Sequence, residues 1–112
     1  MEIIKATEGL TKKQIYKLTH DPATKKVQNA VGQHDLKNFA LYTDIKNDGA
    51  EVQILAMEVD DGEIIATNSQ TFIPQFEEAY EMLEDDGGIN SFEVLETSTK
   101  SGRKCYQFRL ID

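Results

Sequence analysis

Apolar and polar residues alternate over much of the second half of the chain, and this period of two predicts β-strands with one buried face. The first such run begins at Leu36, where Phe39, Leu41 and Ile45 share one face and Tyr42 falls on the other. Asp-Gly dipeptides follow this run and the next one, and they favour the positive φ angles of tight hairpin turns. We therefore predict three consecutive antiparallel strands, over about 36–46, 51–59 and 63–68.

The pattern then changes to a helical period. Pro74 opens a predicted helix of about 74–86, which Gly87-Gly88 ends. Its apolar stripe has the spacing i, i+3, i+4 and i+7 and consists of Phe76, Ala79, Tyr80 and Leu83. Two further strands are predicted at about 91–98 and 103–111, joined by a polar turn that contains glycine.

Three strands, a helix and two strands are the order of a five-stranded OB-type barrel (β-β-β-α-β-β), in which the helix closes one end of the barrel. We therefore predict an α+β, β-rich fold with an OB-like barrel in residues 34–112. A rolled sheet packed against helices would give the same order of elements, so both architectures remain open.

Helical signals dominate the first third of the chain. Thr11 and Gln14 have the spacing of a capping box ahead of a short predicted helix at about 12–19. Asp21-Pro22 has the form of an N-cap followed by proline at the first helical position, which predicts a second helix that Gly32 ends. Residues 1–33 are therefore expected to form an N-terminal helical extension of a single domain, 1–112.

Composition narrows the class of protein. The apolar content is 39% without a long apolar run, and the charged start MEIIKATEGLTKK lacks the apolar core of a signal peptide. We therefore expect a cytoplasmic protein that does not interact with a membrane. Its one cysteine, Cys105, excludes an internal disulfide and falls in a predicted strand, where we expect a half-buried structural thiol.

The net charge of −8 hides a strong segregation along the chain. Residues 1–46 hold eight lysines and five acids, residues 47–96 hold fourteen acids and no base, and residues 97–112 hold four bases and one acid. We expect the basic ends to gather on one face, opposite an acidic face. The local field, and not the net charge, would then direct a charged ligand.

No arrangement of residues predicts catalytic residues, a metal site or a cofactor. His20 and His34 lack the spacing of a helical metal pair and are expected to be solvated. The segment Asp60 to Glu63 lacks the alternating oxygen ligands of an EF-hand and is typical of a hairpin turn. The glycines lack the spacing and the following Lys-Ser/Thr of a phosphate-binding loop.

The sequence does offer cations and aromatic rings for a nucleic-acid-binding site. Proteins that bind single strands contact the phosphates with a basic groove and stack the bases on aromatic faces. Tyr42 is the best stacking candidate if Phe39 and Leu41 face the core, although an ordinary half-exposed strand tyrosine fits as well. Phe72 and Tyr106 would either stack on bases or belong to the core. The cations beside Tyr42 and on the last hairpin are Lys46, Lys100, Arg103 and Lys104.

Several short pieces of the sequence resemble small phage-encoded single-stranded DNA-binding proteins of Gram-positive hosts. They are Gly9 to Lys13 (GLTKK), Ala30 to Gly32, Ala40 to Tyr42, Ala66 to Ser69 with Thr71 and Phe72, and Thr97 to Arg103 (TSTKSGR). The resemblance implies an OB-fold, non-enzymatic coat of replication intermediates in the host cytoplasm. It also implies that the groove residues are Tyr42, Arg103, Lys104 and Tyr106.

Many such proteins recruit partners through a flexible acidic tail, whereas this chain stops at Arg109-Leu110-Ile111-Asp112. A protein partner is therefore expected to dock on the acidic segment 47–96. Binding of single-stranded DNA in a phage or mobile-element replication or recombination system is the leading hypothesis. The acidic segment supports a competing one, an inhibitor or DNA mimic that acts on a host nuclease or repair protein, and an enzyme is the third.

Overall fold

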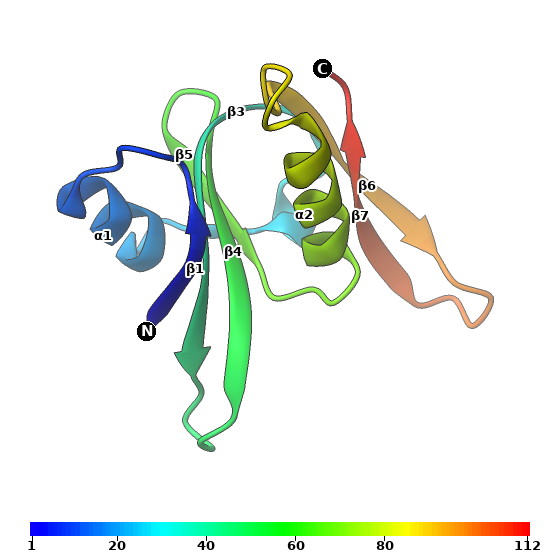
Figure 1. The fold of residues 1–112 in the computed structure, drawn as a ribbon. Helices are drawn as coiled ribbons and strands as arrows, with labels where there is room; N and C mark the ends of the chain where they lie inside the picture. The colour runs from blue at the N-terminus through cyan, green and yellow to red at the C-terminus, as the bar shows by residue number, and fades with distance from the viewer.

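The computed structural model describes residues 1–112 and contains one curled β-sheet and two α-helices (Figure 1). The fold is therefore a β-rich α+β fold. In chain order the elements are β1 (Glu2–Ala6), α1 (Lys12–His20), β2 (Lys25–Lys26), the 3-10 helix η1 (Val27–Asn29), β3 (Gly32–Ile45), β4 (Glu51–Val59), β5 (Glu63–Thr67), α2 (Phe72–Leu83), β6 (Ser91–Ser98) and β7 (Lys104–Leu110).

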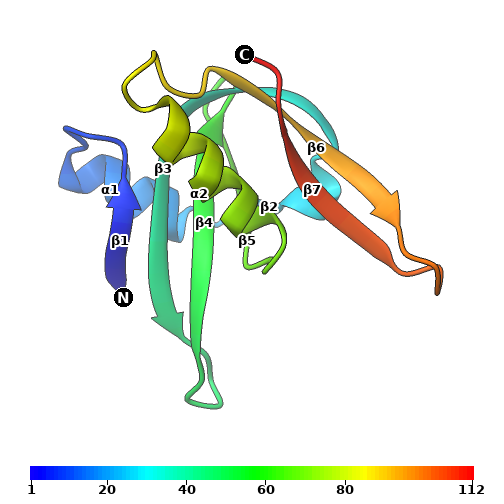
Figure 2. The same ribbon diagram turned by 45° about the vertical axis from the view of Figure 1, so that its right-hand side comes forward.

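The long strand β3 organises the sheet, whose order is β2-β5-β4-β3-β6-β7 with β1 beside β3. One edge of β3 pairs with β4, while the other pairs with β6 through Gly32–Asp35 and with β1 through Ala40–Thr43. A register shift between Leu36 and Asn38 lies between these two stretches. The sheet curls into a half-barrel (Figure 2), and β5 and β7 do not pair with each other.

Helix α2 lies on the concave side of the half-barrel and carries the main core. Fifteen buried residues form this core, including Phe72 and Phe76 of α2. Phe39 of β3 packs edge-on against Phe76 and Tyr80, with ring centroids 5.0 and 4.9 Å apart. The apolar stripe predicted from sequence is therefore confirmed as the face of α2 that turns toward the sheet.

Helix α1 lies on the opposite side of the sheet from α2 (Figure 1) and encloses a second, smaller core. This core joins Leu18 of α1 to residues of three strands, which are Ala40, Tyr42, Ala56 and Ile64. Strands β3 and β4 are consequently covered on both faces. The prediction that one face of β3 is solvated is wrong for this reason.

The predicted second helix in the first third of the chain is also wrong. Asp21 accepts a hydrogen bond from the Ala23 amide at 2.9 Å, and its carbonyl accepts from the Thr24 amide at 3.1 Å. The same Asp-Pro signal that opens helices also opens turns, and here the turn leads into β2, which pairs in parallel with β5. The strand β1 was not predicted, because it is five residues long and mostly exposed.

The other predicted elements are present with boundaries shifted by a few residues. The capping box of α1 is confirmed, with Gln14 Oε1 2.8 Å from the Thr11 amide nitrogen. Ile45 is 67% exposed, contrary to the prediction, because β3 extends beyond both helices at its end. Neither helix has the length and apolar character that crossing a membrane requires.

Candidate nucleic-acid interface

The ion pairs show which cations are already engaged within the protein. Five of the twelve lysines and arginines lie within 4.0 Å of a carboxylate, and every partner comes from the acidic segment 47–96. The basic ends and the acidic middle are thus interleaved in space more than the sequence predicts. The seven cations without a carboxylate partner are Lys12, Lys13, Lys26, Lys37, Lys46, Lys100 and Arg103.

A polar cavity of about 430 Å³ lies where β4 extends beyond β5. Strand β5 ends at Thr67, opposite Leu55, so the first residues of β4 have no neighbouring strand on that edge. Lys46, Gln53 and Asn68 line the cavity together with Ser69 and Gln70, and the one carboxylate in the lining is Glu51. The cavity therefore presents amide and hydroxyl groups beside one unpaired cation and one carboxylate.

A second cavity, of about 270 Å³, adjoins the first at Asn68. Its lining includes Lys26 and Gln28, which follow the short strand β2, and the aliphatic side chains of Ile54 and Ala66. Because Asn68 borders both cavities, together they form one surface around the end of β5. We call this surface the Asn68 trough, and its polar members are Lys26, Gln28, Lys46, Glu51, Gln53, Thr67, Asn68, Ser69 and Gln70.

The loop that carries Asn68 is held by its own side chains. The Ser69 amide donates to Thr67 Oγ1 at 3.0 Å, and Ser69 Oγ accepts from the amides of Thr71 and Phe72 at 3.1 and 3.0 Å. These bonds occupy backbone donors at the start of α2. Asn68 is consequently exposed on a fixed loop and not on a flexible connection.

The β6–β7 hairpin carries the second group of cations. At its tip, the Thr99 hydroxyl contacts Ser101 and accepts from the Arg103 amide, and Lys100 and Arg103 are exposed. Lys104 lies 3.6 Å from Glu96, and the Tyr106 hydroxyl donates to the same carboxylate at 3.2 Å. Glu96 therefore partly neutralises the root of the hairpin, while its tip remains basic.

The structure separates residues that the sequence places in one groove. Tyr42 is only 6% exposed beneath α1, so the prediction of an outward ring is wrong, and Phe72 is fully buried in the main core. Tyr106 packs at the margin of that core. Of the predicted residues, Lys46 lies in the trough, and Lys100, Arg103 and Lys104 lie on the β6–β7 hairpin.

Sequence reasoning missed most of the Asn68 trough. Gln53 belongs to β4 and Asn68 follows β5, whereas Lys26 and Gln28 come from the segment assigned to a helix. The polar run Asn68-Ser69-Gln70 between a strand and a helix was the available signal. This run borders a cavity because β5 ends at Thr67, before the start of β4 finds a partner on that edge.

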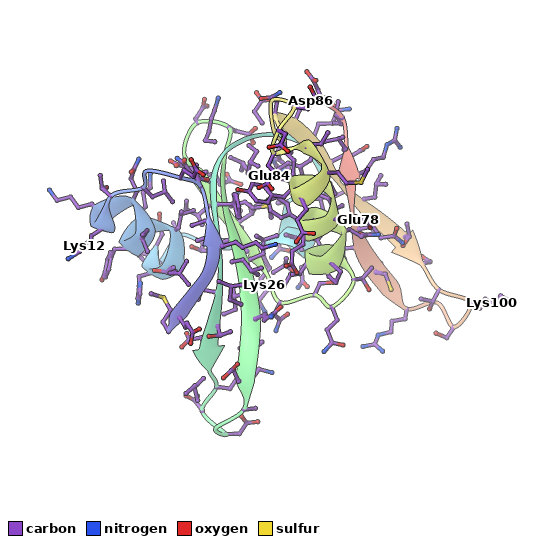
Figure 3. The ribbon with its side chains drawn as sticks, in the orientation of Figure 1. Lys12, Lys26, Glu78, Glu84, Asp86 and Lys100 are labelled. Carbon is purple, nitrogen blue, oxygen red and sulfur yellow. The ribbon has the colours of Figure 1, made fainter.

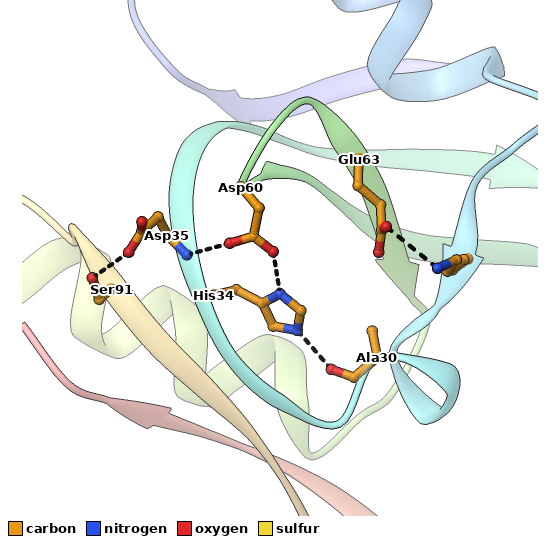
Figure 4. Close-up of polar contacts among 7 residues, drawn as sticks. Ala30, His34, Asp35, Asp60, Glu63 and Ser91 are labelled. Carbon is orange, nitrogen blue, oxygen red and sulfur yellow. Dashed lines mark hydrogen bonds and ion pairs between the residues drawn. The ribbon is translucent and has the colours of Figure 1, made fainter.

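One polar network lies elsewhere, at the bend of β3 (Figure 4). His34 Nδ1 lies 2.8 Å from Asp60 Oδ2, and Nε2 lies 2.7 Å from the Ala30 carbonyl oxygen. Asp60 also accepts from the Asp35 amide, and the Ser91 hydroxyl donates to Asp35. The expectation of a solvated His34 is wrong, because its side chain is only 11% exposed.

Both ring nitrogens of His34 face acceptors, so the network is best satisfied by the charged imidazolium. Burial alone lowers the pKa of His34, but the hydrogen bonds to Asp60 and Ala30 outweigh it and raise the pKa above 6.5. No three histidine, cysteine or carboxylate side chains gather closely enough to share a metal ion. The network connects β3, β6 and the β4–β5 turn, which is a structural role.

Comparisons with known proteins give no relative for this chain: no family model, no curated protein and no solved structure matches it.

Proposed function

We propose that this protein binds single-stranded DNA without catalysis, as a replication or recombination protein of a phage or mobile element. The Asn68 trough and the tip of the β6–β7 hairpin would form its binding surface. The observation that carries the proposal is the placement of unpaired cations, with Lys26 and Lys46 in the trough and Lys100 and Arg103 on the hairpin.

The order of elements supports this assignment. Strands β3 to β7 with α2 correspond to the β-β-β-α-β-β order of an OB-type barrel, and the first and fourth of these strands pair, as β3 and β6. OB folds bind oligonucleotides on the face of their second and third strands and at the loop between the fourth and fifth. The trough lies at the start of β4 and the end of β5, the second and third strands in this order, and the basic hairpin corresponds in chain order to that loop.

The trough offers two kinds of contact to a single strand. Lysine ammonium groups neutralise phosphates, and the amides of Gln53, Asn68 and Gln28 can donate to and accept from base edges. No aromatic ring lines the trough, so base stacking is not its source of affinity. We therefore expect weak base preference and a strong dependence on salt at this surface.

Fluorescence anisotropy with labelled oligo-dT tests the proposal. We expect binding at low salt, and Lys46→Ala, Lys26→Ala and Arg103→Ala should each flatten the plot of log K against log salt by roughly 0.7. Lys37→Ala is the matched control, because Lys37 is an exposed, unpaired lysine at the bend of β3. Absence of binding by the parent protein, or an equal effect of Lys37→Ala, would contradict the proposal.

The competing role of the acidic segment has one observation in its favour. Glu78 of α2 forms no ion pair, and neither do Glu84 and Asp86, which follow the helix. All three are labelled in Figure 3, and an apolar cavity of about 290 Å³ with Met82 and Leu110 adjoins Glu78. This surface fits a basic, amphipathic protein segment. Binding of a lysine- and leucine-containing peptide that Glu78→Lys abolishes, together with no binding of oligo-dT, would favour this second function.

A further inference from the structure

The aromatic rings of this protein are nearly all used in its two cores. All five phenylalanines and Tyr42 are buried, and Tyr80 and Tyr106 are partly buried against the main core. Tyr16 of α1 is different, with 66% of its surface exposed, and it is the only aromatic residue exposed to this extent. Exposed single apolar residues are common in proteins, so its surroundings decide whether the position matters.

Tyr16 is held flat against a neighbour. Its ring stacks on the ring of His20, one helical turn later, with centroids 4.6 Å apart and planes 7° from parallel. The His20 ring is oriented in turn by Thr19, whose hydroxyl lies 2.6 Å from Nδ1. One face of the Tyr16 ring is therefore covered by His20, and the other is available as a flat, pre-oriented surface.

The helix around this ring is basic. Helix α1 contains Lys12, Lys13 and Lys17 and no carboxylate. Lys17 lies 3.6 Å from Glu58, whereas Lys12 and Lys13 are exposed and unpaired, four and three residues before Tyr16. Residues at this spacing lie on the same face of a helix, so two free ammonium groups stand beside the exposed ring.

Tyr16 is not needed to pack α1 against the sheet. The residue of α1 that anchors the helix to the sheet is Leu18, which is 3% exposed within the second core. The Tyr16 hydroxyl makes no hydrogen bond within the protein, in contrast to that of Tyr106. An aromatic face beside free cations is the combination with which proteins hold single-stranded nucleic acid.

We propose that α1 is a second single-stranded DNA contact, in which a base stacks on the free face of Tyr16 and Lys12 and Lys13 hold the flanking phosphates. The ligand class rests on the proposed function. This contact supplies the stacking that the Asn68 trough lacks. In Figure 3, Lys12 and Lys100 lie at opposite ends of the molecule, so a strand long enough to reach both surfaces would gain avidity.

Photo-crosslinking with oligo-dT that contains 5-iodouracil, followed by peptide mapping, tests this contact in the intact protein. We expect the crosslink at Tyr16. In anisotropy titrations Tyr16→Ala should bind a long oligo-dT at least about five-fold more weakly, because a stacked base contributes about 1–3 kcal/mol. Tyr16→Phe keeps the ring and should bind like the parent, while Lys12→Ala and Lys13→Ala should each flatten the salt plot by roughly 0.7.

The controls separate this proposal from the proposed function. If Tyr16→Ala binds like the parent while Lys46→Ala is weakened, the α1 contact is overturned and the proposed function stands. If the parent does not bind oligo-dT, both are overturned. An equal loss in Tyr16→Phe and Tyr16→Ala would assign the contact to the hydroxyl and overturn stacking. If Tyr16→Ala binds DNA like the parent but loses a binding to phosphatidylserine vesicles that the parent shows, the DNA contact is overturned and α1 is assigned to an anionic membrane surface instead.

Discussion

His34 is the residue whose protonation most directly affects the fold. Its imidazolium bridges Asp60 and the Ala30 carbonyl at the point where β3 passes from β6 to β1. Burial alone raises the pKa of Asp60, but the hydrogen bonds from His34 and from the Asp35 amide lower it below its usual 3.8. The two shifts set opposite limits to the pH range in which the network is intact.

The stability of the protein should therefore depend on pH in two separate ranges. The raised pKa of His34 contributes stability that is complete below pH 6.5 and is lost as pH rises through the folded-state pKa. The lowered pKa of Asp60 contributes stability that is present above pH 3.8 and is lost as pH falls through its folded-state value. Urea unfolding followed by circular dichroism over a pH series measures both losses.

His34→Gln should remove the loss of stability that occurs as pH rises through the pKa of His34. It should also lower the unfolding free energy by about 1.5–3 kcal/mol at pH 5, because the lost hydrogen bonds involve charged groups. His20→Gln is the matched control, since His20 is exposed. A parent protein whose unfolding free energy stays constant from pH 5 to pH 9 would contradict the charged state assigned to His34.

Tyr42 illustrates how a residue can affect binding without touching the ligand. Its ring lies in the second core, and burial raises the pKa of its hydroxyl. Tyr42→Ala should lower the unfolding free energy by about 3–5 kcal/mol through the cavity it creates. Arg103→Ala should change it by less than about 0.5 kcal/mol, because Arg103 is exposed. Thermal unfolding distinguishes the two variants before any binding assay, and equal stabilities would contradict the assigned burial.

At the scale of elements, a single hydrogen bond joins the α2 side chain Gln75 to the free edge of β7, beside the ring contacts of Phe72 and Phe76 with Phe108. Gln75 Oε1 accepts from the Phe108 amide at 2.9 Å, and β7 has no neighbouring strand on that edge. This bond substitutes for the strand pairing that would close the barrel. An amide that loses such a partner in a half-buried place costs about 1–3 kcal/mol.

Gln75→Leu should therefore lower the unfolding free energy by about 1–3 kcal/mol and speed hydrogen exchange at the Phe108 amide. Gln75→Glu keeps an acceptor oxygen and serves as the control, with exchange at Phe108 close to that of the parent. Unchanged exchange in Gln75→Leu would mean that the edge of β7 is protected by other contacts.

The elements also show what the sequence could predict. The chain order of the elements from β3 to β7, the α1 capping box and the apolar stripe of α2 were predictable because each depends on residues close in sequence. The burial of Tyr42 was not, because nothing in β3 indicates that α1 covers its second face. The Asn68 trough was missed for the same reason, since it depends on β5 ending before β4.

At the scale of the whole molecule, ion pairing decides which charges are available to a ligand. Each paired lysine or arginine contacts an acid of the segment 47–96, so some cations of the flanking segments are neutralised while the others stay free. Six of the seven unpaired cations lie in three places, on α1, in the Asn68 trough and at the tip of the β6–β7 hairpin, and the seventh is Lys37 of β3. A net charge of −8 is thereby compatible with local binding of a polyanion.

Oligo-dT affinity should fall with salt at a slope of roughly −2 to −3.5, which corresponds to about three to five phosphate contacts at 0.7 each. Titrations at several salt concentrations measure this slope, and duplex DNA of the same length is the control. Affinity that is equal at low and high salt would show that the unpaired cations are not the contact surface.

Strand β3 pairs with β1, β4 and β6, and this also determines when the sheet can be completed during synthesis. The hydrogen bond between Asp35 of β3 and Ser91 of β6 cannot form until Ser91, 56 residues further along the chain, has been synthesised. A ribosome adds about 5–20 residues per second, so the gap between them takes about 3–11 s to synthesise. During that time β3 can pair with β1 and β4, while its first four residues present an open edge to other nascent chains. We therefore expect co-translational aggregation, and not thermal unfolding, to limit the yield of variants that weaken the β3–β6 pairing.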